Sequence, residues 1–126
     1  MPALNRVQLI GYLGRDPETH LTSTGKKVTS FSLAITQRWK SGGETKEATE
    51  WVNIEVWGKL SDVTQEYIHK GSLLYVEGRL KTDRYEEDNE TKYFTKVVVT
   101  GLQMLDRKGS DEPLLSVGDD AADYDA

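Results

Sequence analysis

Apolar and polar residues alternate along most of this chain, which is the period of a β-strand with one buried face. In the clearest segment Phe31, Leu33 and Ile35 share one face, and Ser32 and Ala34 share the other. The same alternation predicts five strands in all, over residues 6–13, 30–35, 50–58, 73–85 and 92–105. Residues 40–46 and 86–91 are polar and rich in turn formers, so we expect two hairpins with polar loops.

A single segment has helical spacing, with apolar residues at Leu60, Val63, Tyr67 and Ile68. It lies between Gly58 and Gly71, and the pattern places His69 and Lys70 in its last turn. Five strands with a helix in the third connection are the order of an OB-fold barrel, whose strand faces and hairpin loops bind oligonucleotides or oligosaccharides. The sequence therefore predicts an all-β fold, a five-stranded OB-fold barrel with one short α-helix between strands three and four.

Length and charge describe one domain followed by a tail. The chain has 126 residues and no cysteine, which excludes disulfides, thiolate metal sites and cysteine nucleophiles. Residues 1–108 hold all 16 lysines and arginines with 15 of the 21 acids, and residues 109–126 hold the other six acids and no base. The tail has too little apolar surface to offset the entropy of ordering it. We therefore expect a domain at 1–108 and a disordered acidic tail at 109–126.

Several kinds of signal are missing from the sequence. No apolar run approaches the roughly 20 residues of a membrane span, and no basic-then-apolar signal pattern opens the chain, so we expect a cytoplasmic protein. His20 falls in a polar loop and His69 at the helix end, without the neighbours that a catalytic triad or a metal site needs. We interpret both histidines as surface residues and expect no enzyme, no cofactor and no metal.

The strand at residues 50–58 carries aromatic residues on a face that a small barrel does not need to bury. Val52, Ile54 and Val56 fall on one face, and Trp51 and Trp57 fall on the other. If the aliphatic side points inward, two indoles stand on the outer surface, where flat rings suit base stacking. Covering of these rings by a neighbouring subunit, the helix or a loop is the alternative reading of this strand.

Two further aromatic residues are flanked by bases. Trp39 lies between Arg38 and Lys40, and Tyr85 follows Arg84. A cation beside a stacking ring supplies a phosphate contact next to a base contact, as a groove for single strands requires. Trp39 has the parity of the inward residues of its strand, so we expect it at the surface only if the strand ends or bulges before it.

Four motifs follow one another along the chain: NRVQLIGYLGRDPE at residues 5–18, TEWVNIEVWGKL at 49–60, YIHKG at 67–71 and YVEGRL at 75–80. In this order and at this spacing they resemble the bacterial single-stranded DNA-binding protein (SSB) family, over nearly all of residues 4–105. The resemblance implies an OB-fold that assembles as a homotetramer in the cytoplasm, associated with the nucleoid. It also implies that the protein wraps single-stranded DNA without sequence preference and protects it during replication, recombination and repair.

The resemblance implies site residues position by position. The implied stacking aromatics are Trp39, Trp51, Trp57 and Tyr85, where the family often has phenylalanine at the third position and tryptophan at the fourth. The implied phosphate contacts are Arg6, Lys59, Lys70 and Arg84.

The C-terminus departs from the family pattern. Members typically end in an acidic tip closed by Pro-Phe, which docks into basic pockets on replication and repair proteins, whereas this chain ends Asp-Tyr-Asp-Ala. The corresponding partner-binding residues would be Asp119, Asp120, Asp123, Tyr124 and Asp125. Three readings stay open: a shortened chain, a divergent tip with Tyr124 in place of phenylalanine, or a paralogue without partner recruitment.

The leading hypothesis is therefore sequence-independent binding of single-stranded DNA. One alternative is an OB-fold accessory protein of the replication machinery that acts mainly through protein contacts, which would not need three tryptophans on its binding face. Another is an RNA-binding OB domain, which only a direct comparison of DNA with RNA separates, because stacking barely senses the sugar.

Overall fold

Strands make up most of the computed structural model, which describes residues 2–105 and 115–116. Its elements in chain order are β1 (Val7–Leu13), β2 (Glu18–Leu21), β3 (Lys27–Ser41), β4 (Glu44–Trp57), α1 (Lys59–Tyr67), β5 (Leu73–Glu87), β6 (Glu90–Met104) and β7 (Leu115–Ser116). In this described part of the chain, no helix has the length and apolar character needed to cross a membrane.

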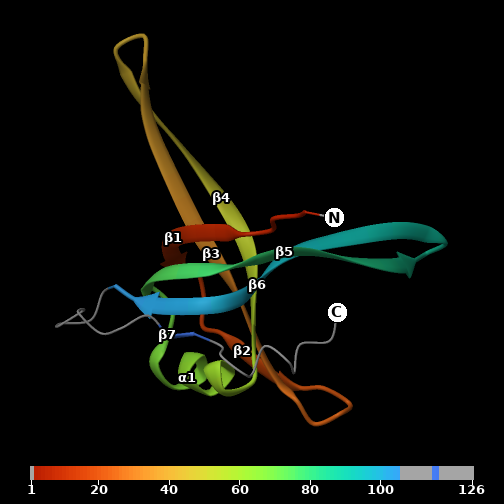
Figure 1. Cartoon of the computed structure of the whole chain (residues 1–126). Helices are drawn as coiled ribbons and strands as arrows, with labels where there is room; N and C mark the ends of the chain where they lie inside the picture. Colours follow the sequence, from red (N-terminus) through yellow and green to blue (C-terminus); the bar gives the residue numbers. More distant parts are fainter. Residues whose placement is uncertain (1, 106–114, 117–126) are drawn as a thin grey trace.

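Five of the strands close into a barrel (Figure 1). Hydrogen-bonded neighbours follow the order β1–β5–β6–β4–β3, and β1 returns to pair with β3 at Leu13 and Leu33. The two strands approach so closely there that a Cβ on Gly11 would collide with the carbonyl of Ala34, so this position requires glycine. The closed barrel, with one helix between β4 and β5, confirms the predicted OB-fold.

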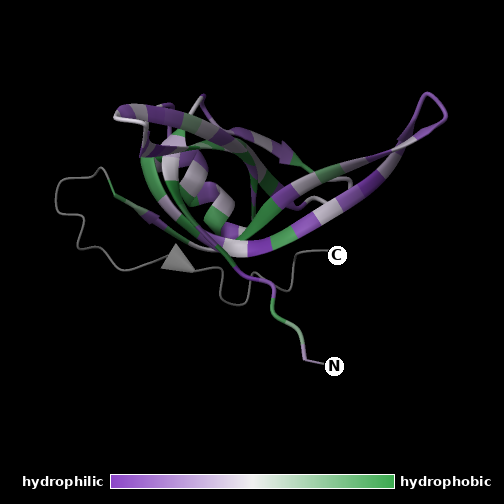
Figure 2. Ribbon diagram, turned by 90° about the horizontal axis from the view of Figure 1, so that it is seen from above, coloured by the Kyte–Doolittle hydropathy of each residue, from purple (hydrophilic) through white to green (hydrophobic). Residues whose placement is uncertain are grey.

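The inward residues of the strands form the core, as their alternation predicts. The most completely buried of these side chains are Leu33, Ile54, Val56, Leu74, Val76 and Leu102. Leu60 and Ile68, from and just after α1, join the same cluster, so the helix covers one end of the barrel. Figure 2 shows the hydrophobic segments gathered in the barrel wall around the helix. The outer faces of the strands are thereby left for other contacts.

One strand was not predicted. β2 pairs with β3 from Glu18–Ser30 to Leu21–Lys27, so the prediction that His20 lies in a polar loop is wrong. β2 is an edge strand that contributes no residue to the buried core, and backbone hydrogen bonds to β3 hold it together with a side-chain hydrogen bond between Thr19 and Thr29. Apolar alternation reports burial of a face, which explains why it does not reveal this strand.

The β3–β4 hairpin extends well beyond the strands predicted at 30–35 and 50–58, and the β5–β6 hairpin extends a little beyond those predicted at 73–85 and 92–105. β3–β4 turns at Gly42 and Gly43 and β5–β6 turns at Asp88 and Asn89, all four with positive φ, as two-residue hairpin turns require. The loops are therefore shorter than predicted, because the strands continue pairing through polar residues. Residues 36–50 are called the β3–β4 arm and residues 79–96 the β5–β6 arm. The two arms leave the barrel in different directions (Figure 1).

The ends of two predicted segments also differ. α1 ends at Tyr67 and the next residue, Ile68, is extended, so the prediction that His69 and Lys70 form the last helical turn is wrong. Extended backbone lets the Ile68 side chain enter the core, where it is 3% exposed. The predicted tail at 109–126 lies outside the described residues apart from β7, whose two residues pair with β6.

Candidate nucleic-acid interface

The outer face of β4 presents the two predicted tryptophans. Ile54 and Val56 are buried and point inward, which confirms the predicted division of this strand into two faces. Trp51 is 59% exposed, whereas Trp57 is half-buried. The two indoles therefore differ in how much ring they offer to a ligand, and Trp51 offers the more open one.

Trp51 forms one wall of a surface hollow, the Trp51 hollow, together with Gly14, Arg15 and Ser32. The ring lies against the backbone at Gly14, where any side chain would collide with it. The Arg15 side chain is exposed beside it and makes no hydrogen bond or ion pair with residues 2–105. An open ring beside an uncommitted guanidinium is the combination that a stacked base and its phosphate require.

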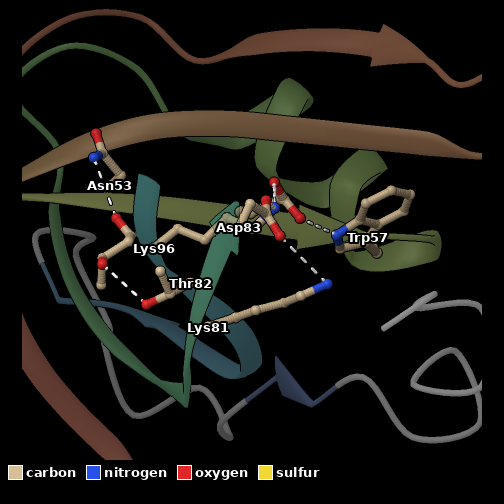
Figure 3. Close-up of polar contacts among 8 residues, drawn as sticks. Asn53, Trp57, Lys81, Thr82, Asp83 and Lys96 are labelled. Carbon is tan, nitrogen blue, oxygen red and sulfur yellow. Dashed lines mark hydrogen bonds and ion pairs between the residues drawn. The ribbon is translucent and has the colours of Figure 1, made fainter. Parts of the chain in front are cut away.

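Polar side chains link the outer face of β4 to the β5–β6 arm (Figure 3). The indole N–H of Trp57 donates to Glu55 Oε1 at 2.6 Å, and Lys96 Nζ donates to Glu55 Oε2 at 2.6 Å. Lys96 Nζ also lies 2.8 Å from Asp83 Oδ2, and Lys81 Nζ lies 3.5 Å from Asp83 Oδ1. This arm network, residues Glu55, Trp57, Lys81, Asp83 and Lys96, orients the Trp57 ring and ties the arm to the barrel.

The central ion pairs of the arm network hold their groups charged. Burial lowers the pKa of Lys96, but hydrogen bonds and charges from Asp83 and Glu55 outweigh it, so the pKa lies above its ordinary value. The hydrogen bond from Lys96 keeps the pKa of Asp83 below its ordinary value, against the opposing effect of burial. Lys96 and Asp83 are therefore both charged at neutral pH.

A second hollow lies between the outer face of β3 and β4 and the β5–β6 arm. This Phe94 hollow is lined by Arg15, Asp16, Glu18, Ser30, Phe31, Ser32, Asn53, Ile54, Glu55, Phe94 and Lys96. It shares Arg15 and Ser32 with the Trp51 hollow, so the two are neighbours on one surface. Asn53 lies in it with its amide nitrogen donating to the carbonyl of Thr95 at 3.4 Å (Figure 3).

Phe94 and Arg15 were not among the predicted site residues. Phe94 is 43% exposed and lies opposite Asp83 in the register of β5 and β6. The predicted hairpin at residues 86–91 pairs Tyr85 with Lys92, and continuing that pairing would have placed Phe94 and Tyr85 on one face. No sequence signal distinguishes Arg15 from the other bases, because its relation to Trp51 depends on the fold.

Trp39 lies in the β3–β4 arm and is 47% exposed. The expectation that it reaches the surface only where β3 ends or bulges is wrong, because regular pairing with β4 continues to Ser41 and Glu44. Trp39 is exposed because the arm has left the barrel, so both of its faces meet solvent. By parity it lies on the opposite face of the hairpin from Trp51, and the structure does not bring these two rings together.

Tyr85 lies in the β5–β6 arm and is 44% exposed. It shares its face of the arm with Phe94, whereas Arg84 pairs with Tyr93 and falls on the other face. The aromatic residues Trp51, Phe94 and Tyr85 therefore follow one another from the barrel face onto this arm.

The predicted phosphate contacts do not form one cluster. Arg6 precedes β1 and lies 3.3 Å from Glu77 of β5, at the β1–β5 side of the barrel. Lys59 opens α1, and Lys70 follows the helix, with its backbone N–H donating to Asp16 Oδ1 at 2.8 Å. The predicted tail residues Asp119, Asp120, Asp123, Tyr124 and Asp125 lie outside the described residues.

Residues 4–105 match the model of the single-strand binding protein family, which spans the whole barrel and both arms. The chain belongs to this family. Its members are DNA-binding proteins and not enzymes, in agreement with the expectation that this chain is not an enzyme.

Individual relatives agree with this family assignment. The single-stranded DNA-binding protein 1 of Chlorobaculum tepidum is 48% identical over 111 residues, which are 85% of this chain and 68% of that protein. The single-stranded DNA-binding protein of Xanthomonas axonopodis pv. citri is 43% identical over 108 residues, which are 84% of this chain and 60% of that protein. This SSB-family chain thus spans about two thirds of the length of such relatives.

A solved structure shares the fold. The Plasmodium falciparum SSB in complex with single-stranded DNA superposes with a TM-score of 0.77 at 31% identity, covering 84% of this chain and 98% of that one. The similarity extends over the barrel that carries the two hollows.

Proposed function

We propose that this chain binds single-stranded DNA without sequence preference, by stacking bases on exposed aromatic rings and by contacting phosphates with lysine and arginine. The open ring of Trp51 beside the uncommitted Arg15, on the outer face of the barrel, is the observation that carries this proposal. Membership of the SSB family and similarity to an SSB solved with single-stranded DNA support it. The reading as an accessory protein that acts mainly through protein contacts has no support from the relatives.

The residues of the proposed site differ in how much each contributes to DNA binding. Trp51 is the principal stacking residue, and Trp57 contributes the exposed part of its half-buried ring, whose N–H donates to Glu55. Tyr85 extends this surface along the β5–β6 arm, and Trp39 offers a separate ring on the β3–β4 arm. Lys59, Lys70, Arg84 and Arg6 are further phosphate contacts. Stacking is worth about 1–3 kcal/mol per base, so a few rings suffice for useful affinity.

The proposal includes assembly into a homotetramer. Ile10 and Tyr12 of β1 are 56% and 55% exposed on the outer face, and Ile10 pairs in register with Tyr75 of β5. Within the described residues, β1 pairs with β5 along Val7–Tyr12 and meets β3 only at its last two residues, so most of its other edge is free. Apolar surface beside an open strand edge suits a second copy of the chain.

The biological setting that fits this activity is protection of single strands during replication, recombination and repair, in the cytoplasm and at the nucleoid. Binding of replication and repair proteins by the acidic residues Asp119, Asp120, Asp123, Tyr124 and Asp125 belongs to the same proposal. Deleting residues 109–126 should leave DNA affinity nearly unchanged and abolish any such protein contact in a pull-down.

Titration of the intrinsic tryptophan fluorescence with oligo-dT tests the proposed function. We expect strong quenching that saturates at a fixed number of nucleotides, a weak response to duplex DNA and a decrease in affinity with salt. Oligo-U in a parallel titration separates DNA from RNA binding. An absence of quenching together with an absence of binding by an independent method would contradict the proposal.

A further inference from the structure

We propose that the Phe94 hollow is a second base subsite, which takes an amino-bearing base of the same DNA strand next to the base stacked on Trp51. This inference rests on the proposed function and deepens it, because it names the residues that receive a second nucleotide and adds a modest base preference at this one subsite to binding that requires no particular sequence.

Phe94 supplies the ring of this subsite. Its side chain is 43% exposed and stands outside the core cluster, so the fold does not need an aromatic residue at this position. It lines the hollow from the β6 side, while Asn53 lines it from β4. The arm network holds the two sides together, since Lys96 of β6 is bonded to Glu55 of β4 at 2.6 Å. The ring is therefore presented on a fixed wall.

Asn53 supplies a hydrogen-bond acceptor. A carbonyl oxygen can only accept a hydrogen bond, so the Asn53 atom that contacts the Thr95 carbonyl is the amide nitrogen. The amide oxygen, Oδ1, therefore points away from Thr95. No donor among residues 2–105 bonds to this oxygen. An exocyclic amino group of cytosine or adenine can donate to it, whereas thymine presents a carbonyl at the corresponding position.

The charges around the hollow exclude a phosphate and accept a base. Three carboxylates, those of Asp16, Glu18 and Glu55, line it, and Lys96 is already engaged by Glu55 and Asp83. Arg15 lines both hollows and has no partner within residues 2–105. A strand with one base on Trp51 and the next on Phe94 would bring the phosphate between them to Arg15, at the boundary and away from the carboxylates.

The experiment measures the affinity of the full chain for labelled oligo-dC and oligo-dT of equal length by fluorescence anisotropy. Phe94→Leu keeps an apolar side chain but removes the ring, and we expect at least a fivefold loss for both oligonucleotides. Phe94→Tyr keeps the ring and should stay within about twofold of the unmodified chain. Tyr93→Leu is the matched control, because Tyr93 is 66% exposed one residue away on the opposite face of the arm, and its loss should be smaller.

Asn53→Ala tests the base chemistry. Removal of Oδ1 should weaken oligo-dC binding by about twofold to tenfold and oligo-dT binding by less, so the ratio of the two affinities falls. Equal losses for both oligonucleotides would overturn the preference for amino-bearing bases. A Phe94→Leu chain that binds as the unmodified chain does, or that loses no more than Tyr93→Leu, would overturn the subsite itself. Binding of neither oligonucleotide by the unmodified chain would instead refute the proposed function.

Discussion

The two arms are built alike and differ in how they are attached. Each is an antiparallel hairpin that leaves the barrel, ends in a two-residue turn and carries an exposed aromatic residue, Trp39 in one and Tyr85 in the other. Every residue of the β3–β4 arm is exposed. In the β5–β6 arm Lys81, Asp83 and Lys92 alternate with exposed residues and are half-buried, because one face of this arm is held against the barrel.

The difference shows that attachment, and not the presence of an aromatic residue, decides what an arm contributes. The β5–β6 arm is fixed to β4 by the ionic hydrogen bond from Lys96 to Glu55, and Asp83 of the same arm also pairs with Lys96, so the arm completes a hollow with the outer face of β4. The β3–β4 arm has its charged contacts within itself, such as the 2.8 Å pair of Arg38 with Glu47, which raises the pKa of Arg38. We therefore expect that ligand binding restricts the motion of the β3–β4 arm, whereas the β5–β6 arm is already held against the barrel.

The largest expected effect is the difference in binding between variants of Trp51, on the barrel face, and of Trp39, on the β3–β4 arm. Trp51→Ala should weaken oligo-dT binding by about 1–3 kcal/mol, because a preformed stacking ring is lost. Trp39→Ala should weaken oligo-dT binding by about a third of that free energy, since stacking a base on Trp39 also requires ordering of the exposed β3–β4 arm. Equilibrium binding titrations measure both, and circular dichroism checks the fold. A greater loss for Trp39→Ala would reverse the comparison.

The next effect concerns the attachment itself. Lys96→Met leaves the carboxylate of Glu55 without its cation and that of Asp83 with Lys81 alone, and it should lower the free energy of unfolding by about 2 kcal/mol. Arg38→Met removes the fully exposed ion pair of the β3–β4 arm and should leave stability unchanged within error. Urea unfolding curves of the two variants and of the unmodified chain measure these free energies of unfolding. Equal stabilities would mean that the arm network does not hold the β5–β6 arm.

A smaller effect concerns salt. Each phosphate contact to a single strand adds about 0.7 to the slope of log K against log salt concentration. Arg15→Gln should reduce the slope by about this amount per bound chain, because Arg15 has no partner within the described residues to compete with a phosphate. Arg38→Gln, in which the lost guanidinium was paired with Glu47, should change the slope less. Identical slopes for Arg15→Gln and the unmodified chain would show that Arg15 does not contact a phosphate.

The smallest effect is a dependence on pH. The pKa of Asp83 is lowered in the folded chain, so its stabilising contribution is present above its unfolded pKa of about 4 and is lost as pH falls through the folded pKa. The difference in melting temperature between the unmodified chain and Asp83→Asn should be steady from about pH 5 to 8 and shrink below about pH 4. Glu47→Gln, on the other arm, should show a smaller difference throughout. A difference that is constant down to about pH 2 would contradict an ionic pair between Asp83 and Lys96.

Period-two alternation was enough to predict the barrel and the outward direction of Trp51, because burial of one strand face leaves a direct trace in the sequence. It missed β2 and the outer half of the β3–β4 hairpin, where backbone hydrogen bonds form without a buried face. It also missed the contact of Glu55 with Lys96, since two polar residues 41 positions apart carry no sign of their pairing.

The residues of this chain on their own determine which side chains point into the barrel, where the hairpins reverse and which family the chain resembles, since each follows from local periodicity, turn chemistry or short motifs. Tertiary structure alone decides which outward residues meet. Asn53 and Phe94 become two walls of one hollow because β4 and β6 lie side by side in the barrel, and Trp39 and Trp51 fall on opposite faces because β3 and β4 stay in register. Alternation assigns a residue to one face of a strand, but only the closed barrel determines which other residues lie opposite that face.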